Sequence, residues 1–202
     1  MALISVSNNA LQNITAVPAS VPSGALVLLS TQTASSSASL SFTSGIDSTY
    51  DSYVFKFINI HASETADFEF QCSTDGGSTY ATTITSTYFR AFHYEDDTVT
   101  NLQYPSAFDE AQTTNFQTLL RVPTANNDNN GSGTLQLFNP SSTTYVKHFI
   151  SSSNNYVDTT VVYSTNDYVA GYFNTTSAIN AIRFQMSSGN IDDGVIKMYG
   201  VK

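Results

Sequence analysis

Short segments in which apolar and polar residues alternate run along most of the chain. The clearest is 67–73, DFEFQCS, where Phe68, Phe70 and Cys72 fall on one side and acidic or amide residues on the other. A period of two residues is typical of a β-strand with one buried face. We therefore expect these three residues in the core and their neighbours at positions 67, 69 and 71 at the surface.

Other segments predict further strands. Residues 53–60, YVFKFINI, place Tyr53, Phe55 and Phe57 on one face and Val54, Ile58 and Ile60 with Lys56 on the other. A strand that is apolar on both faces is usually central and covered on both sides. The remaining strand candidates are 25–34, 38–44, 79–92, 134–138, 145–151, 159–164, 167–174, 178–188 and 194–201.

Turn-forming residues separate these segments. Asp75-Gly76-Gly77 tolerates the positive φ angles of tight turns, and it predicts a hairpin that joins 67–73 to 79–92. Asn154-Asn155 predicts a break, and 126–133 is a loop by composition. Residues 109–119 are compatible with a short helix or a long loop.

Many short strands with polar turns predict an all-β fold, an antiparallel β-sandwich of jelly-roll-like form. The length of 202 residues suits one such domain, which we place at 25–202. Residues 1–24 lack sustained alternation and contain Pro18 and Pro22, so we expect an extended N-terminal arm. Both ends of the domain, 25–31 and 195–201, have strand character, and we expect them to pair and close the sheet.

The scarcity of charge narrows the functional classes. Only 11% of the residues are charged and the net charge is −9, whereas soluble domains average roughly 25% charged residues. Seven cations do not supply the basic cluster that nucleic acid or an anionic membrane requires. Polarity comes from hydroxyl and amide side chains, whose contacts depend little on salt. No basic segment precedes the short apolar stretch after Met1, so we expect no secretory signal peptide.

Chemistry-bearing motifs are absent from the sequence. His61, His93 and His148 lack metal-ligand spacing, and Cys72 has no neighbouring histidine that could activate it. No GxSxG, GxGxxG or Walker pattern is present. We therefore expect no enzyme activity, no catalytic residue, no cofactor and no metal site, with Cys72 as a buried, inert thiol.

Two acidic stretches leave one alternative open. Glu95-Asp96-Asp97 and the downstream Asp109-Glu110 could contribute oxygen ligands to calcium if their loops converge. Otherwise they are solvated loop charges.

Tyrosines near turns are the best candidates for contact residues. The chain has 12 Tyr and no Trp, and Tyr50, Tyr94, Tyr104 and Tyr156 lie at expected strand ends. Exposed Tyr beside Asn suits protein or glycan recognition, although such residues also simply cap strands. The candidate contact residues are Tyr94, Tyr104, Tyr156, Asn126 and Asn127.

Several segments together resemble a known family. They are the leader NNALQNITAVPA and the segments 44–63, 70–80, 137–151, 170–194 and 196–200. They are similar to small, uncharacterised virion structural proteins of tailed phages that infect marine and aquatic bacteria. The resemblance implies a β-sandwich particle component, located in the virion, that decorates the capsid or belongs to a tail or fibre. It supplies no catalytic residues.

The first functional expectation is a non-enzymatic capsid decoration or cement protein, exposed on the particle and forming a homo-oligomer. It would bind the major capsid protein or another virion protein, with Ala2–Pro22 and the loops in 93–131 as contact elements. The alternative is a receptor-binding module on a tail or fibre that recognises a host surface glycan. A polysaccharide hydrolase is the least favoured reading, and we expect neither nucleic acid nor membrane as a partner.

Overall fold

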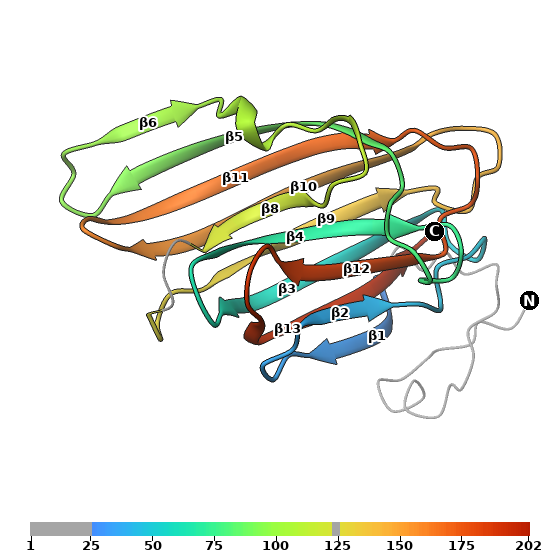
Figure 1. Cartoon of the computed structure of the whole chain (residues 1–202), viewed down its shortest axis with the longest axis horizontal. Coiled ribbons are helices and arrows are strands. Elements are labelled where there is room, and N and C mark those ends of the chain that lie inside the picture. Colours follow the sequence, from blue (N-terminus) through green and yellow to red (C-terminus); the bar gives the residue numbers. More distant parts are fainter. Residues whose placement is uncertain (1–25, 123–125) are drawn as a thin grey trace, which may run out of the picture.

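The protein, seen in a computed structural model that describes residues 26–122 and 126–202, is built almost entirely of antiparallel strands (Figure 1). The predicted arm at 1–24 lies outside the described residues. The described elements are β1 (Val27–Thr33), β2 (Ser39–Phe42), β3 (Ser52–Ala62), β4 (Ala66–Ser73), β5 (Ile84–Tyr94), β6 (Thr100–Gln103), the 3₁₀ turn η2 (Ser106–Phe108), β7 (Ala111–Thr113), β8 (Gln117–Val122), β9 (Gly131–Phe138), β10 (Lys147–Asp158), β11 (Val162–Phe173), β12 (Ala181–Met186) and β13 (Ile191–Val201).

Two sheets of unequal width form a sandwich. The large sheet has the order β1-β13-β3-β9-β10-β11-β5-β6, with β7 also paired to β5, and the small sheet has the order β2-β12-β4-β8. The edge strand β8 contacts β10 and β11, and β5 and β6 extend beyond it (Figure 1). The predicted antiparallel β-sandwich is confirmed. The expected pairing of the terminal strands is confirmed as well, because β1 pairs with β13, but it does not close the sheet, since β1 is an edge strand.

The large sheet has two faces and can be divided into two halves. Its inner face is turned toward the small sheet, and its outer face is turned away. Its near half consists of β1, β13, β3 and β9, and its far half of β10, β11, β5 and β6.

Phenylalanine rings fill the space between the small sheet and the inner face. Phe68 stacks on Phe184 with ring centres 5.7 Å apart, and Phe70 meets Phe149 edge-on at 5.1 Å. Phe68, Phe70 and Cys72 are fully buried, as their alternation predicts. Gln71 was expected at the surface but is also buried, because its amide donates to the backbone carbonyls of residues 114 and 115.

The prediction that β3 is covered on both faces is wrong. The strand is central in the sheet, but on its outer side Val54 is only half-buried and Ile58 is 38% exposed. Ile60, expected beside them, is fully buried. The pairing with β9 shifts between Phe57 and Ile60, and Asn59 there has a positive φ of 52°. This bulge turns Ile60 to the inner face.

The predicted hairpin after β4 is also wrong, although its turn exists. Gly76 and Gly77 have φ angles of 75° and 90°. The carboxylate of Asp75 accepts hydrogen bonds from Ser73 and Thr79, which lower its pKa. However, β4 pairs with β12 and β8, and β5 pairs with β11. The turn therefore carries the chain from the small sheet to the large one instead of closing a hairpin.

Two smaller expectations fail in the same part of the fold. Asn154 and Asn155 do not interrupt the chain but lie inside β10. Residues 109–119 form no α-helix and contain β7 and the start of β8. Among the described residues, η2 is the one helical turn that precedes them.

Candidate binding surface on the large sheet

The outer face of the large sheet is open to solvent across the described residues. Directly paired residues on neighbouring strands share a face, so the register divides this surface into rows. One row runs across the sheet as Leu28, Tyr199, Val54, Gln136, Ile150, Ala170 and Thr87. In this row Leu28 is 52% exposed and Ile150 is 56% exposed. We call it the apolar row.

Two lysines stand opposite one another beside this row. Lys56 of β3 pairs in register with Lys197 of β13, and both are half-buried. The Lys56 ammonium lies 5.5 Å from the ring centre of Tyr199, and no described carboxylate forms a salt bridge with either lysine. Like charges directly across a sheet are destabilising. The pair is thus a positive site on a chain of net charge −9, and neither lysine has an acidic partner among the described residues.

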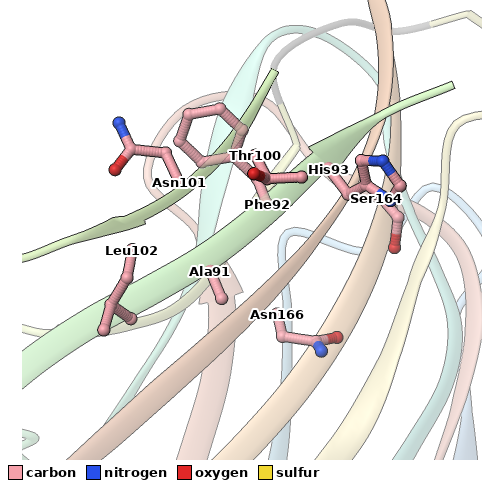
Figure 2. A pocket seen from close by; sticks show the side chains of 8 residues that line it. All are labelled: Ala91, Phe92, His93, Thr100, Asn101, Leu102, Ser164 and Asn166. Atoms are coloured by element: carbon pink, nitrogen blue, oxygen red, sulfur yellow. The ribbon is translucent and has the colours of Figure 1, made fainter. Parts of the chain in front are cut away.

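A shallow trough lies on the far half of the sheet, with a volume of about 690 Å³. Its lining comes from β5, β6 and β11. Figure 2 shows Leu102, Ala91 and Asn166 on one side of the ribbon, and Phe92 and Asn101 on the other. The register agrees, since Ala91 is paired with Leu102 and with Asn166, which places all three on the outer face.

Residue size explains the trough. Along β5 the outer positions are Phe89, Ala91 and His93, so a methyl group lies between two large rings. Leu102 of the neighbouring strand is 70% exposed and forms a rim. The small side chain of Ala91 therefore forms the floor of the trough.

An aromatic pair and an amide cluster adjoin the trough. Phe89 stacks on Tyr168 of β11 with ring centres 5.0 Å apart and planes 14° from parallel, and Phe89 is 42% exposed. The Asn154 amide donates to Asn166 Oδ1 at 2.7 Å and to Ser164 Oγ at 2.8 Å. This surface therefore combines an exposed ring with several fixed hydrogen-bonding groups.

The inner face of the far half has a different composition, because it meets the free edge of β8. Ser153 donates to the Leu119 carbonyl at 2.9 Å, and the Asn155 amide donates to the Arg121 carbonyl. Both donors are buried on β10, and both acceptors are backbone groups of β8. Polar side chains in this part of the core thus satisfy backbone carbonyls that would otherwise be buried without partners.

A buried acid lies in the same layer. Asp167 is 1% exposed, and Tyr88 donates a hydrogen bond to its Oδ1 at 2.6 Å. Burial raises the pKa of Asp167, and burial followed by the negative charge of Asp167 raises the pKa of Tyr88. The outer trough is lined by neither residue.

The structure scatters the sequence-predicted contact residues. Tyr94 is on the inner face, with its ring centre 5.4 Å from that of Tyr163. Tyr104 is 59% exposed at the opposite end of β6, where its hydroxyl donates to Asp109. Tyr156 is half-buried on the outer face of β10.

The two asparagines lie in the turn before β9. Asn126 and Asn127 are exposed, and the Asn126 amide reaches the Asp158 carbonyl at 3.4 Å. This places Asn126 near Tyr156 at the β10–β11 end. None of the five predicted contact residues lines the trough.

Sequence reasoning missed Phe89, Ala91 and Asn166. The available signal was the segment 87–94, TYFRAFHY, which is bulky on both sides of the strand. One side had to face solvent if the strand lay in the wide sheet of a sandwich. The small Ala91 between rings on that side marks the trough.

The acidic stretches do not meet. Asp96 bonds to Thr98 in the turn before β6, whereas Asp109 accepts from the Tyr88 backbone beyond the other end of β6. No group of three His, Cys, Asp or Glu residues that could hold a metal occurs within 26–122 and 126–202. The lone Cys72 is free, and burial raises its pKa.

Comparison of the chain with protein-family models, curated proteins and solved structures finds no match. In the part of the chain that the structure describes, no helix is long and apolar enough to cross a membrane. The geometry and charge of the outer face are therefore the basis for assigning a function.

Proposed function

We propose that this chain is a non-enzymatic structural module that docks on a protein partner through the near half and centre of its outer face. The observation that carries the proposal is the Lys56–Lys197 site beside the apolar row, which has no acidic partner within residues 26–122 and 126–202. Apolar groups give contact area, and two lysines on directly paired positions suit a carboxylate on the partner. The partner surface is thus apolar with an acidic centre.

The resemblance to phage virion proteins favours one form of this role. It is a decoration or cement protein on the virion surface, bound to the major capsid protein and present as a homo-oligomer. The nearly uncharged exterior supports it, because contacts through hydroxyl, amide and apolar groups persist over a wide range of salt. Residues 2–22 and the loops in 93–131 are further contact elements in this proposal.

The strand order supports a jelly roll with two insertions. When β5–β7 and β10–β11 are set aside, the first strand pairs with the last, the second with the penultimate, β3 with β9 and β4 with β8. This is the pattern of a long antiparallel hairpin wrapped into two sheets. The insertions widen the sheet that carries the proposed docking face.

Burial of the reactive groups supports a non-catalytic role. Asp167 is the acid with the most buried environment, and it lies between the sheets with its Tyr88 partner. The thiol of Cys72 is fully buried, and its pKa is raised well above its usual range. Groups in these positions stabilise or fill the core and do not face the trough.

A charge-reversal experiment tests the docking face. Full-length protein carrying both Lys56→Glu and Lys197→Glu is mixed with particles that lack it, and binding is measured by co-sedimentation. We expect at least about tenfold weaker binding, because carboxylates would face the acidic partner. Lys202→Glu at the exposed chain end is the matched control and retains binding.

Imaging of intact particles supplies an independent check. Many copies on the capsid, with the outer face toward the capsid protein, agree with the proposal. Few copies confined to a tail tip, or full binding by the double variant, would contradict it. The tail-tip result would favour the receptor-binding alternative.

A further inference from the structure

We propose that the trough on the far half of the outer face is a binding site for a neutral oligosaccharide. This site is separate from the docking face, since its lining comes from β5, β6 and β11, whereas Lys56 and Lys197 lie on β3 and β13. The trough would give the protein a second, exposed recognition surface while its protein partner covers the near half.

The shape of the trough fits an extended chain of sugar rings. Ala91 forms the floor, Leu102 the rim on β6, and Asn166 with Ser164 the opposite wall on β11. The depression is open along its length and is not a closed cavity. An oligosaccharide lying on a sheet face needs such an open trough, whereas a small compact ligand would be left largely in water.

The aromatic pair supplies the apolar contact. Phe89 is 42% exposed and is held by its stack on Tyr168, so its ring is fixed before any ligand binds. Sugar rings present C–H groups on one face, and an immobilised aromatic ring offers flat apolar area at low entropic cost. The pair lies one step along β5 and β11 from Ala91 and Asn166, within the span of a short oligosaccharide.

Amide and hydroxyl groups beside the ring supply the polar contacts. Asn154 holds Asn166 through its Oδ1, and no hydrogen bond among the described residues engages the Nδ2 group of Asn166. Ser164 and Thr100 are exposed along the same depression, and both are paired with His93 on the outer face. Asparagine and serine offer both donors and acceptors, which match sugar hydroxyls.

The charge of the site selects a neutral ligand. No Asp, Glu, Lys or Arg lines the trough, and its one ionisable residue, His93, is bonded to Asp97 at 2.9 Å. The chain as a whole has a net charge of −9. An anionic glycan would approach a negative protein and find no cation in the trough, so uronate-rich or sulfated chains are disfavoured.

The test is binding of full-length protein to an array of neutral and anionic oligosaccharides, followed by calorimetry on the tightest neutral ligand. We expect binding to at least one neutral series and none to sulfated or uronate chains. Phe89→Ala removes the exposed ring and should weaken binding by about tenfold. Ala91→Leu fills the floor and should weaken it at least as much.

Ile150→Ala is the matched control, since Ile150 is a comparably exposed apolar residue on the same face but outside the trough. It should bind as the unaltered protein does, and the urea midpoint of every variant is recorded to confirm folding. The proposal is overturned if no neutral oligosaccharide binds, or if binding survives both Phe89→Ala and Ala91→Leu. If the unaltered protein binds a neutral oligosaccharide but does not bind the capsid, the proposed function alone is rejected.

Discussion

On the far half of the large sheet, some residues on each face depart from the usual distribution of polar and apolar side chains, while Phe149 and Val157 of β10 remain buried on the inner face. Along β10 the inner residues Ser151, Ser153 and Asn155 are at most 4% exposed, while the outer residue Ile150 is 56% exposed. A half-buried strand normally places its apolar residues inside. Here the same strand places hydroxyl and amide groups in the core and a large aliphatic group in water.

Each departure has its own physical cause. The inner groups are polar because they donate to backbone carbonyls: Ser153 and Asn155 bond to carbonyls of β8, and Ser151 bonds to the Thr134 carbonyl of β9. On the outer face, Ile150 is 56% exposed and Phe89 is 42% exposed, so burial in the core does not account for them. They are therefore available for the binding roles proposed above. Residues on the inner face therefore stabilise the fold, whereas those on the outer face are available for recognition. Substitutions at adjacent residues, one on each face, should differ in their effect on stability.

The largest effect is expected for Phe149→Ala. The ring is 1% exposed and packs against Phe70 and Phe173, so its removal should lower the free energy of unfolding by about 3–5 kcal/mol. The adjacent Ile150→Ala should change it by less than about 0.5 kcal/mol. Urea unfolding measures both. Similar losses for the two variants would show that the outer face is covered in the folded protein.

The next largest loss of stability is expected at one of two adjacent asparagines. Asn155→Ala leaves the Arg121 carbonyl buried without its donor and should destabilise the protein by about 1–3 kcal/mol. Asn154→Ala removes bonds at the exposed surface, where water replaces the lost partner, and should cost less than about 1 kcal/mol. The same denaturation measurement compares them. A larger loss for Asn154 would reverse the assignment of inner and outer roles.

These pairs also show how far the sequence alone predicts the fold. Alternation correctly predicted the buried face of β4, since a period of two needs no knowledge of the partner strand. Turn-forming residues were a weaker guide. The predicted break at Asn154-Asn155 was wrong, because asparagine favours turns locally but Asn155 here bonds to the backbone of another strand. The predicted hairpin at Gly76-Gly77 was also wrong, because local turn chemistry does not reveal whether the next strand returns to the same sheet.

The candidate site was less predictable than the fold. Alternation does not reveal that Phe89 is exposed, because a ring's burial depends on which face the opposite sheet covers. The trough depends on Ala91 being paired with Asn166 and Leu102, and these contacts are distant in sequence or lie across a turn. Tyr94, Tyr104 and Tyr156 were selected for turn proximity, which does not determine their face.

A third test uses the pH dependence of the buried acid. The folded pKa of Asp167 is raised from its ordinary value of 3.8 by burial, so the folded state holds this proton more tightly than the unfolded state. Its contribution to stability is fully present below pH 3.8 and is lost as the pH rises through the folded pKa. Asp167→Asn should therefore gain stability relative to the unaltered protein as the pH rises above 3.8.

The measurement is the urea midpoint of both proteins across this pH range. Taking the difference between them removes the shared contributions of Asp67 and Glu69, whose pKa values are also raised by burial. A difference that is flat with pH would contradict a buried acid on the inner face.

The smallest effect on stability is expected for Phe89→Ala, and it bears most directly on the outer face. The variant loses a stack on Tyr168 that is open to solvent, so the free energy of unfolding should fall by only about 0.5–1.5 kcal/mol. Tyr88→Phe, one residue away on the inner face, keeps its ring but leaves Asp167 with only the longer bond from Thr165, and it should cost about 1–3 kcal/mol. If the loss of this whole outer ring costs no more than the loss of one inner hydroxyl, folding stability does not account for Phe89 on the outer face.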